Sequence, residues 1–398
     1  MGIRGLKTLI KKKVPGSLRI RPISYYKNTI IAIDVNILLY KACYSYPVKD
    51  YNSFLFFFIN KCISFLNNGI LPIFIFDGKT PIEKKKILYK RQLTKRNNKE
   101  RLQQLKNIQH PSFTIQKQIQ KLEKKTSLCV THYHIELLKR LFYSLGIPYF
   151  IAQSGEAEQL CACLQKQHIV DYSVSDDTDT LVFGSCSLLT CLHRTNTTLM
   201  EWDLNMILSK LKLTFPQFVD FCILTGCDYT DSIPGININE SLYYIQKYKT
   251  IEQCLPFLQK KYNTLLYYNQ QYTTTENPCN EHDEHEQYNT TVDDGNNNNN
   301  DNNNSITEHY SSPSSTSTFF NYKRARELFD TLLEDECTML IPHIKLNNFQ
   351  LSVFQTLLSS INCIPSKINE YCDTIQHSIK LFYTIHTKTK HVKNTQCT

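Results

Sequence analysis

Two short, almost entirely apolar runs, each followed by an aspartate, constrain the fold more than any other feature of the 398-residue chain. They are Thr29–Ile33, followed by Asp34, and Leu71–Phe76, followed by Asp77. Fully apolar strands are typical of a parallel sheet that helices cover on both faces, and ligands bind beyond the carboxyl ends of such strands. The apolar-rich stretch Phe54–Leu66 between them has the length of a crossover helix. We therefore predict an α/β fold with a twisted, mainly parallel sheet flanked by helices.

The sequence from residue 151 to residue 184 adds further acidic residues. Glu156 and Glu158 are predicted to open a helix whose N-cap is Ser154 or Gly155. The positive pole of the helix dipole at that end favours carboxylates.

After this helix, Tyr172–Ser175 is predicted to be a short strand that runs into Asp176, Asp177 and Asp179. Residues two apart in an extended segment point to one side, so Asp177 and Asp179 are expected to face the two glutamates. Carboxylates that converge in this way need a cation, and oxygen ligands alone suit Mg²⁺ or Mn²⁺ rather than zinc. The alternative is a solvated turn with acidic side chains.

The net charge of +9 is unevenly distributed along the chain. From Lys84 to Lys106 there are ten basic residues against Glu100 alone, and Lys84 and Arg91 are seven residues apart, on one helix face. A cationic helix beside a carboxylate cluster suits a phosphodiester substrate, although a charged run can also be a solvated helix face. The lysine-rich segment Lys117–Lys125 continues this region, which we expect to become ordered on binding.

The rest of the composition indicates an intracellular protein. The fifteen cysteines form no CxxC pairs, which indicates reduced thiols rather than disulfides or a zinc site. No signal peptide is recognisable, and the apolar run Phe54–Ile59 is too short to cross a membrane. We therefore expect a protein that is not secreted and does not bind a membrane.

Six phrases, taken in this order, resemble the structure-specific 5′ nucleases and, among them, the flap endonucleases: MGIRGL, IAIDVN, FIFDGKTP, GIPYFIAQSGEAEQ, SDDTDTLVFG and QFVDFCILTGCDYTDSIPGI. The resemblance covers residues 1–249 and, more weakly, 322–383. It implies a PIN-like nuclease core with a helical arch and a helix-two-turn-helix region that binds duplex DNA. It also implies hydrolysis of DNA at 5′ flaps or single-strand/duplex junctions, in replication (Okazaki fragment maturation) and repair.

The resemblance also implies roles for individual residues. It implies two Mg²⁺ ions, for which Mn²⁺ can substitute, held by two carboxylate clusters: Asp34, Asp77, Glu156 and Glu158, and Asp177, Asp179 and Asp228. Lys84 and Arg91 are implied as catalytic residues that contact the scissile phosphate. The DNA-binding residues it implies are Gly2, Tyr40, Lys84, Arg91, Gly226, Asp228 and Gly235. For Tyr40, packing in the core is the alternative.

The chain departs from this family at the hairpin turn. Gly235 is followed by Ile-Asn-Ile-Asn where the family usually has Ile-Gly-Pro-Lys. We expect Asn237 to adopt the left-handed conformation of that glycine and the backbone N–H groups of the turn to face a phosphate. The resemblance implies a K⁺ ion at this turn, and the missing basic residue is expected to weaken the binding of both K⁺ and the phosphate of the downstream duplex. Between Tyr40 and the next helix, the short segment Ser45–Asp50 stands in place of the family's longer acidic loop, which bears on recognition of a 3′ flap.

A pattern near the C-terminus fits the sliding-clamp motif of the family. Its residues are Gln376, Ile379, Phe382 and Tyr383. The alternative is that a helical stripe through these positions packs on the body of the protein. The expected partners are thus DNA with a 5′ flap or junction and a sliding clamp, and the protein is expected to be a monomer.

From the resemblance we expect an N-terminal nuclease region (1–107) with a basic arch (about 84–130), an internal nuclease region (130–268) with a helix-turn-helix segment (about 215–250), and a C-terminal helical segment (322–383). The polar, Asn-rich stretch 269–318 cannot bury a core, so its composition predicts a disordered insertion. The last residues, 384–398, form a basic, polar tail. The alternatives are a 5′→3′ duplex exonuclease, a related enzyme that acts on RNA, and an inactive DNA-binding scaffold. A nuclear location fits a cellular enzyme, and a cytoplasmic factory fits a viral one.

Overall fold

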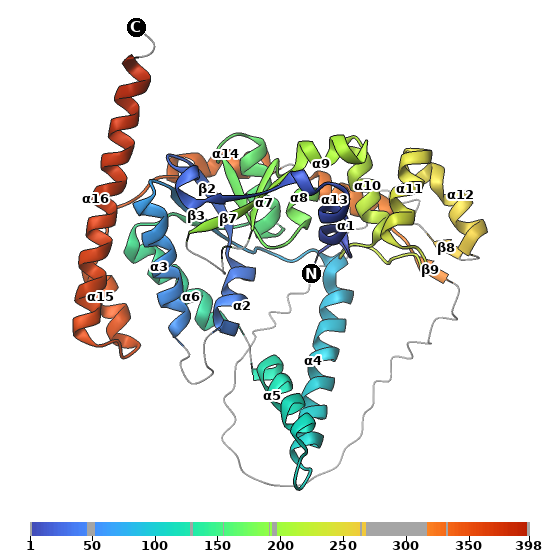
Figure 1. The fold of residues 1–398 in the computed structure, drawn as a ribbon, viewed down its shortest axis with the longest axis horizontal. Helices are drawn as coiled ribbons and strands as arrows, with labels where there is room; N and C mark the ends of the chain where they lie inside the picture. The colour runs from blue at the N-terminus through green and yellow to red at the C-terminus, as the bar shows by residue number, and fades with distance from the viewer. Residues whose placement is uncertain are drawn as a thin grey trace, which may run out of the picture.

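The computed structural model describes residues 2–45, 52–127, 130–153, 155–190, 192, 197–262, 265–267, 317–331 and 333–395. At its centre is a seven-stranded sheet with the strand order β1-β7-β6-β5-β2-β3-β4 (Figure 1). The strands are β1 (Leu18–Pro22), β2 (Ile30–Asp34), β3 (Leu71–Phe76), β4 (Tyr149–Ile151), β5 (Tyr172–Val174), β6 (Ser187–Thr190) and β7 (Thr198–Asp203). β6, β5, β2, β3 and β4 pair in parallel, whereas β7 is antiparallel to both β6 and β1. The predicted α/β fold with a mainly parallel sheet is confirmed.

The helices are α1 (Leu6–Lys13), α2 (Val35–Ser45), α3 (Ser53–Asn67), α4 (Lys85–Lys106), α5 (Phe113–Ser127), α6 (His132–Leu145), α7 (Ala157–Lys166), α8 (Asp179–Val182), α9 (Leu204–Leu211), α10 (Phe215–Thr225), α11 (Ile238–Tyr248), α12 (Ile251–Tyr262), α13 (Tyr322–Asp330), α14 (Glu334–Leu340), α15 (Leu351–Ser360) and α16 (Pro365–Thr395). None of those in the described part of the chain has the length and apolar character needed to cross a membrane.

The central strands are apolar throughout because helices cover both faces of the sheet. Ala32 and Ile73 pack in one apolar cluster with residues of α7 and α14. Ile33 and Phe74 point to the other face, where they pack with α3 and α6. The ring of Phe74 stacks on that of Phe142, with 4.0 Å between the ring centroids. β2 pairs with β5, so the predicted N-terminal and internal regions contribute to one sheet and one core.

The arch consists of α4 and α5, which project from the body of the protein (Figure 1). α4 buries none of its residues. An ion pair between Lys106 Nζ and Glu123 Oε1, at 2.7 Å, joins the last residue of α4 to the C-terminal half of α5. The segments that we expected to become ordered on binding are therefore helical in this structure, and they support each other.

The C-terminal part differs from the prediction in two places. The last helix was expected to end near Tyr383, but α16 continues to Thr395 and extends beyond the body (Figure 1). Most of the predicted basic tail is thus helical. Of the predicted insertion, residues 269–316 lie outside the described residues, whereas Ser317 and Thr318 belong to β9 (Ser317–Phe319), which pairs in parallel with β8 (Leu265–Tyr267).

Candidate active site

The carboxyl edge of the sheet holds the first group of predicted ligands. Asp34 is the last residue of β2, Asp77 follows β3, and Asp177 follows β5. β5, β2 and β3 are neighbours in the sheet, so their parallel carboxyl ends lie at one edge. Two further carboxylates come from helices: Glu158 lies in the first turn of α7, and Asp228 follows the end of α10.

The start of α7 differs from the prediction. Glu156 is the N-cap, with an extended backbone (φ −112°, ψ 154°), and Ala157 is the first helical residue. Gly155 has φ +85°, and Ser154 lies outside the described residues. The N–H of Ala157 donates to Asp77 Oδ1 at 2.8 Å. A side chain from the end of β3 therefore takes the role that a local cap would have, and the contact fixes α7 against the edge of the sheet.

Asp177 and Asp179 come together through a turn, so the prediction of an extended segment is wrong. β5 ends at Val174, and Asp179 already begins α8. The N–H of Asp179 donates to Asp177 Oδ1 at 3.2 Å. Ser175 Oγ accepts the N–H of Asp177 at 3.1 Å and donates to Asp34 Oδ2 at 2.9 Å, which links the turn to β2.

Burial and mutual repulsion shift the pKa values of these carboxyl groups upward. Burial, followed by the Asp77 carboxylate, raises the pKa of Asp34 to about 7. Burial, followed by the Asp177 carboxylate, raises the pKa of Asp179 to about 8. Burial and then repulsion from Asp177 also raise the pKa of Glu158 well above its ordinary value. Acidic groups held together in this way need a compensating positive charge.

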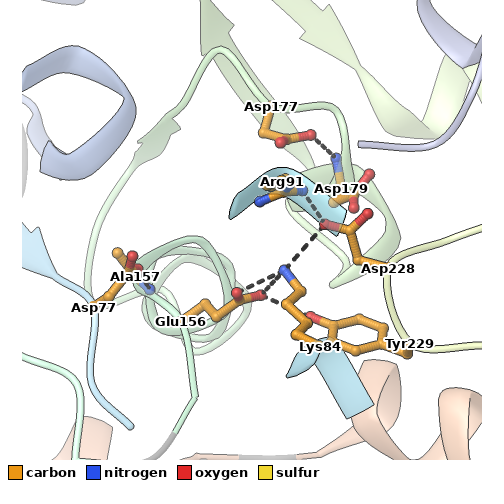
Figure 2. Close-up of polar contacts among 9 residues, drawn as sticks. All are labelled: Asp77, Lys84, Arg91, Glu156, Ala157, Asp177, Asp179, Asp228 and Tyr229. Atoms are coloured by element: carbon orange, nitrogen blue, oxygen red, sulfur yellow. Dashed lines mark hydrogen bonds and ion pairs between the residues drawn. The ribbon is translucent and has the colours of Figure 1, made fainter. Parts of the chain in front are cut away.

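Two basic residues at the base of the arch, Lys84 directly before α4 and Arg91 within it, supply part of that charge (Figure 2). Lys84 Nζ donates to both carboxylate oxygens of Glu156, at 2.6 Å each, and lies 3.7 Å from Asp228 Oδ2. Arg91 Nη2 lies 2.8 Å from the same oxygen of Asp228. Burial alone would lower the pKa of Lys84, but the neighbouring glutamates and Asp228 outweigh it and raise that pKa. The predicted catalytic cations and the predicted ligands therefore form one charged cluster.

Gly2 and Ile3, near the N-terminus, lie against this cluster. Gly2 has φ +89°, and a Cβ there would overlap the Asp177 carboxylate and lie 2.8 Å from Asp179 Oδ1. The N–H of Ile3 donates to Asp179 Oδ1 at 2.7 Å. Only glycine fits both this conformation and this close approach.

One residue of the cluster, Tyr229, was missed by the sequence analysis. Its hydroxyl donates to Glu156 Oε2 at 2.8 Å, and Lys84 Nζ lies 5.0 Å from the centre of its ring (Figure 2). The one available signal was its place directly after Asp228. Tyr229 holds Glu156 and Lys84 in register with each other.

The chemistry of the donors fits a hard divalent cation. All seven predicted ligands are carboxylates, which Mg²⁺ and Mn²⁺ prefer. Within the described ranges, no three acidic, histidine or cysteine side chains surround one point closely enough to hold an ion in this conformation. Glu156 is instead bound by Lys84, so its oxygens would have to exchange that ammonium group for a metal ion.

Tyr40 is exposed, so the alternative that it packs in the core is wrong. Its side chain on α2 is 54% exposed, and that of Tyr44, one helical turn later on the same face, is also 54% exposed. Both rings are accessible for stacking.

At the hairpin turn, Gly226 and Gly235 adopt backbone conformations that favour glycine, with φ of +113° and +87°. Asn237 does not: its φ of −108° and ψ of 168° make it the N-cap of α11, so the predicted left-handed conformation is wrong. Asn237 Oδ1 accepts the N–H groups of Asn239 and Glu240, at 3.0 and 3.1 Å, and Glu240 Oε2 accepts the N–H of Asn237. This capping box occupies N–H groups at the start of α11, next to the turn whose backbone N–H groups we expected to face a phosphate.

The clamp pattern lies within α16, and two of its four residues, Ile379 and Phe382, pack on the body as the alternative predicted. Phe382 is 6% exposed and belongs to the same apolar cluster as Ile375 and residues of α3. The Tyr383 hydroxyl donates to the carbonyl of Leu346 at 3.2 Å. Gln376 is exposed on the outer face of the helix.

Comparison with known proteins places the chain in a family. The chain matches the family models described as XPG N-terminal domain, over residues 1–99, and XPG I-region, over residues 146–228. It is 33% identical over 273 residues to flap endonuclease 1-B of Oryza sativa subsp. indica, a match that covers 65% of each chain and so slightly less than two thirds of the relative. It is 34% identical to flap endonuclease 1 of Micromonas commoda, covering 66% of this chain and 70% of that one.

Solved structures share the fold. Flap endonuclease-1 from Methanococcus jannaschii superposes with a TM-score of 0.57 at 17% identity, covering 95% of this chain and 99% of the other. Human GEN1, solved in complex with Holliday junction DNA, superposes with a TM-score of 0.55 at 15% identity, covering 97% of this chain and 78% of the other. One fold is thus shared by proteins whose named functions differ.

Proposed function

Because the chain belongs to the XPG and flap endonuclease family of structure-specific 5′ nucleases, we propose that it hydrolyses DNA phosphodiesters at 5′ flaps or other single-strand/duplex junctions. The observation that carries the proposal is the direct contact of two arch cations, Lys84 and Arg91, with the carboxylate cluster at the edge of the sheet. Its products would carry a 5′-phosphate and a 3′-hydroxyl, and its role would lie in DNA replication and repair.

The cofactor in this proposal is Mg²⁺, for which Mn²⁺ substitutes. One ion would be held by Asp34, Asp77, Glu156 and Glu158, and a second by Asp177, Asp179 and Asp228. The chemistry that such a pair supplies, when bound, is activation of the attacking water and neutralisation of charge on the leaving oxygen.

Lys84 and Arg91 have the task of binding the scissile phosphate. A phosphate oxygen is the same kind of acceptor as the carboxylate oxygens that these two side chains contact here, so substrate would compete for the same N–H donors. Tyr229 also donates to Glu156, and this bond holds the glutamate in place when Lys84 leaves it.

Tyr40 and Tyr44 are proposed to stack on nucleobases next to the site. Stacking on an aromatic ring requires no particular base, which suits an enzyme that recognises a junction rather than a sequence. α2 begins directly after Asp34, so the exposed rings lie on the helix that leads away from the proposed metal site.

We also propose that a K⁺ ion binds at the hairpin turn and that the protein is a monomer in solution. A cellular enzyme would be located in the nucleus, and a viral one in a cytoplasmic factory. A sliding clamp is the proposed protein partner. Its binding through Gln376, Ile379, Phe382 and Tyr383 would require the buried ring of Phe382 to leave its contacts with the body.

The test is single-turnover cleavage, with Mg²⁺, of end-labelled DNA that carries a 5′ flap, a nick, a blunt end, a 3′ overhang or a four-way junction. The variant is Asp179→Asn, and the matched control is Asp335→Asn, which changes an exposed aspartate on α14. The proposal predicts cleavage at the flap junction that is lost in the first variant and kept in the second.

Other outcomes would replace the proposal. Stepwise release of nucleotides from blunt ends would indicate the duplex exonuclease. Preferential cleavage of the four-way junction would indicate a junction-resolving enzyme. Cleavage of an RNA flap but not of a DNA flap would indicate an RNA-directed enzyme. DNA binding without cleavage, with Mn²⁺ also tried, would leave only a scaffold.

A further inference from the structure

A groove of about 820 Å³ leads from the carboxylate cluster to the hairpin turn before α11. The first turns of α4 line one side, and residues 225–238 line the other. Gly2 and Asp228, which belong to the candidate active site, line it as well, together with Arg4 and Gly5. The groove is therefore continuous with the proposed site of cleavage but extends beyond the residues assigned to it.

The acidic side chains that line this groove are already neutralised. Asp228, Asp231 and Glu83 each have a cationic partner within hydrogen-bonding distance. The pairs are Asp228 with Arg91 at 2.8 Å, Asp231 with Lys86 at 2.6 Å, and Glu83 with Arg324 at 2.7 Å. These carboxylates therefore contribute little net negative charge to the groove.

Two cations of the groove, Arg4 and Lys90, have no such compensation. Neither forms an ion pair with any residue in the described ranges, and both side chains are exposed. Lys90 lies one helical turn after Lys86, on the same face of α4. Two uncompensated cations among neutralised acids make the groove attractive to a polyanion.

The far end of the groove offers fewer backbone donors than an uncapped helix start would. Asn237 Oδ1 accepts the N–H groups of Asn239 and Glu240, the second and third residues of α11, so a phosphate there would have to displace this side chain to reach them. Side chains across the groove are therefore the more accessible donors for a phosphate in this part of the molecule.

We propose that Arg4 and Lys90 bind the sugar-phosphate backbone of the DNA strand that runs from the active site past the hairpin turn. This inference rests on the proposed function, because it takes DNA as the polyanion. Arg4 and Lys90 are positioning residues: they hold the strand in register with Lys84 and Arg91 and touch no reacting atom. Their contacts replace those that the capped start of α11 does not make.

The test measures DNA affinity against salt. Binding of flap DNA in EDTA is followed by fluorescence anisotropy between 50 and 200 mM NaCl, for Arg4→Gln, Lys90→Gln and the double variant. Each lost phosphate contact should lower the slope of log K against log salt by about 0.9. Arg4→Lys and Lys90→Arg should restore the slope, because they keep the charge. If the two residues had a purely structural role, the slope would not depend on the charge of the substituted side chain.

The matched control is Lys27→Gln, which removes an exposed lysine just before β2, at the opposite edge of the sheet from the carboxylates. Its slope should equal that of the unchanged protein. Unchanged slopes for both Arg4→Gln and Lys90→Gln would overturn the proposal, and so would absence of DNA binding by the unchanged protein. Cleavage is assayed separately, so binding with the expected slopes but without cleavage would refute the proposed nuclease function and leave the groove assignment intact.

Discussion

The two ends of the groove are built in opposite ways. At one end, Asp34 and Asp179 are buried among other carboxylates, and contacts between residues far apart in the chain hold them there, such as the bond from Ile3 to Asp179. At the other end, Asn237 and Glu240 cap α11 through bonds between residues two or three positions apart.

The carboxylate cluster at the first end lowers the stability of the fold, whereas the capping box at the second end raises it. Crowded buried carboxylates are unfavourable unless a cation binds, so their presence indicates a function. The capping box favours the start of a helix, and it does so by using donors that a ligand could otherwise have. The hairpin end thus gains local stability and gives up N–H donors, whereas the functional end is favourable only when a cation binds.

The largest effect is expected from Asp179→Asn at the functional end. Loss of one proposed ligand should lower single-turnover cleavage by about a thousandfold or more, the equivalent of several kcal/mol. At pH 9, above the pKa of about 8 of Asp179 in the folded protein, the same change removes one charge from the cluster, so in EDTA it should raise the free energy of unfolding by on the order of 1 kcal/mol. Urea denaturation measures the second effect. A variant that is inactive but less stable would show that Asp179 has a structural role.

The second prediction concerns pH without metal. In the folded protein, burial and neighbouring carboxylates raise the pKa of Asp34 to about 7 and that of Asp179 to about 8, so folding favours their protonated forms. Their contribution to stability is present below the ordinary pKa of 3.8 and is lost as the pH rises through the folded values. In EDTA, the melting temperature should fall by several degrees between pH 5 and pH 8.5.

Magnesium should reverse this trend, because it binds the ionised carboxylates. We expect Mg²⁺ to raise the melting temperature strongly at pH 8 and hardly at all at pH 5. The double variant Asp34→Asn/Asp179→Asn is the control, and its melting temperature should depend less on pH and on Mg²⁺. An equal response to pH in the variant and in the unchanged protein would contradict the assignment to these two groups.

The sequence predicted correctly those elements that residues close together in the chain determine. The apolar runs before Asp34 and Asp77 became β2 and β3, because alternating side chains have helices to pack against on both faces. The errors occurred where a distant residue decides. Glu156 is the N-cap because Asp77, eighty residues from Ala157, accepts the first N–H of the helix.

Tyr229 is a similar case, since its role depends on Glu156, seventy-three positions away. Asn237 was mispredicted for a different reason. The family pattern suggested a glycine-like conformation, but the sequence Asn-x-x-Glu is itself a capping box, and this local signal was stronger. α16 exceeds its predicted length because its polar final turns continue beyond the body, where packing periodicity gives no indication of an end.

The third prediction tests the hairpin end. Asn237→Ala removes the cap of α11 and should cost about 1 kcal/mol of stability, whereas Asn237→Gly should cost only a few tenths. Both variants free the N–H groups of Asn239 and Glu240 for a phosphate. Anisotropy should then show flap DNA bound a few-fold more tightly by Asn237→Gly. Weaker binding would show instead that the Asn237 side chain contacts DNA.

The smallest effect is expected from removing residues 268–316, which lie between β8 and β9 and outside the described residues. β8 and β9 pair in parallel, and Figure 1 places them at the same end of the molecule as α11 and α12. A parallel pair needs a connection of about a dozen residues, so a Gly-Ser linker of that length should preserve the pairing. Shortening the connection about fourfold changes its closure entropy by only about 1 kcal/mol. Cleavage and flap affinity should therefore stay within about twofold, with an insertion of scrambled sequence as the control. A shortened protein that cleaves normally but binds DNA with a lower salt slope would show that this segment adds phosphate contacts beyond those of Arg4 and Lys90.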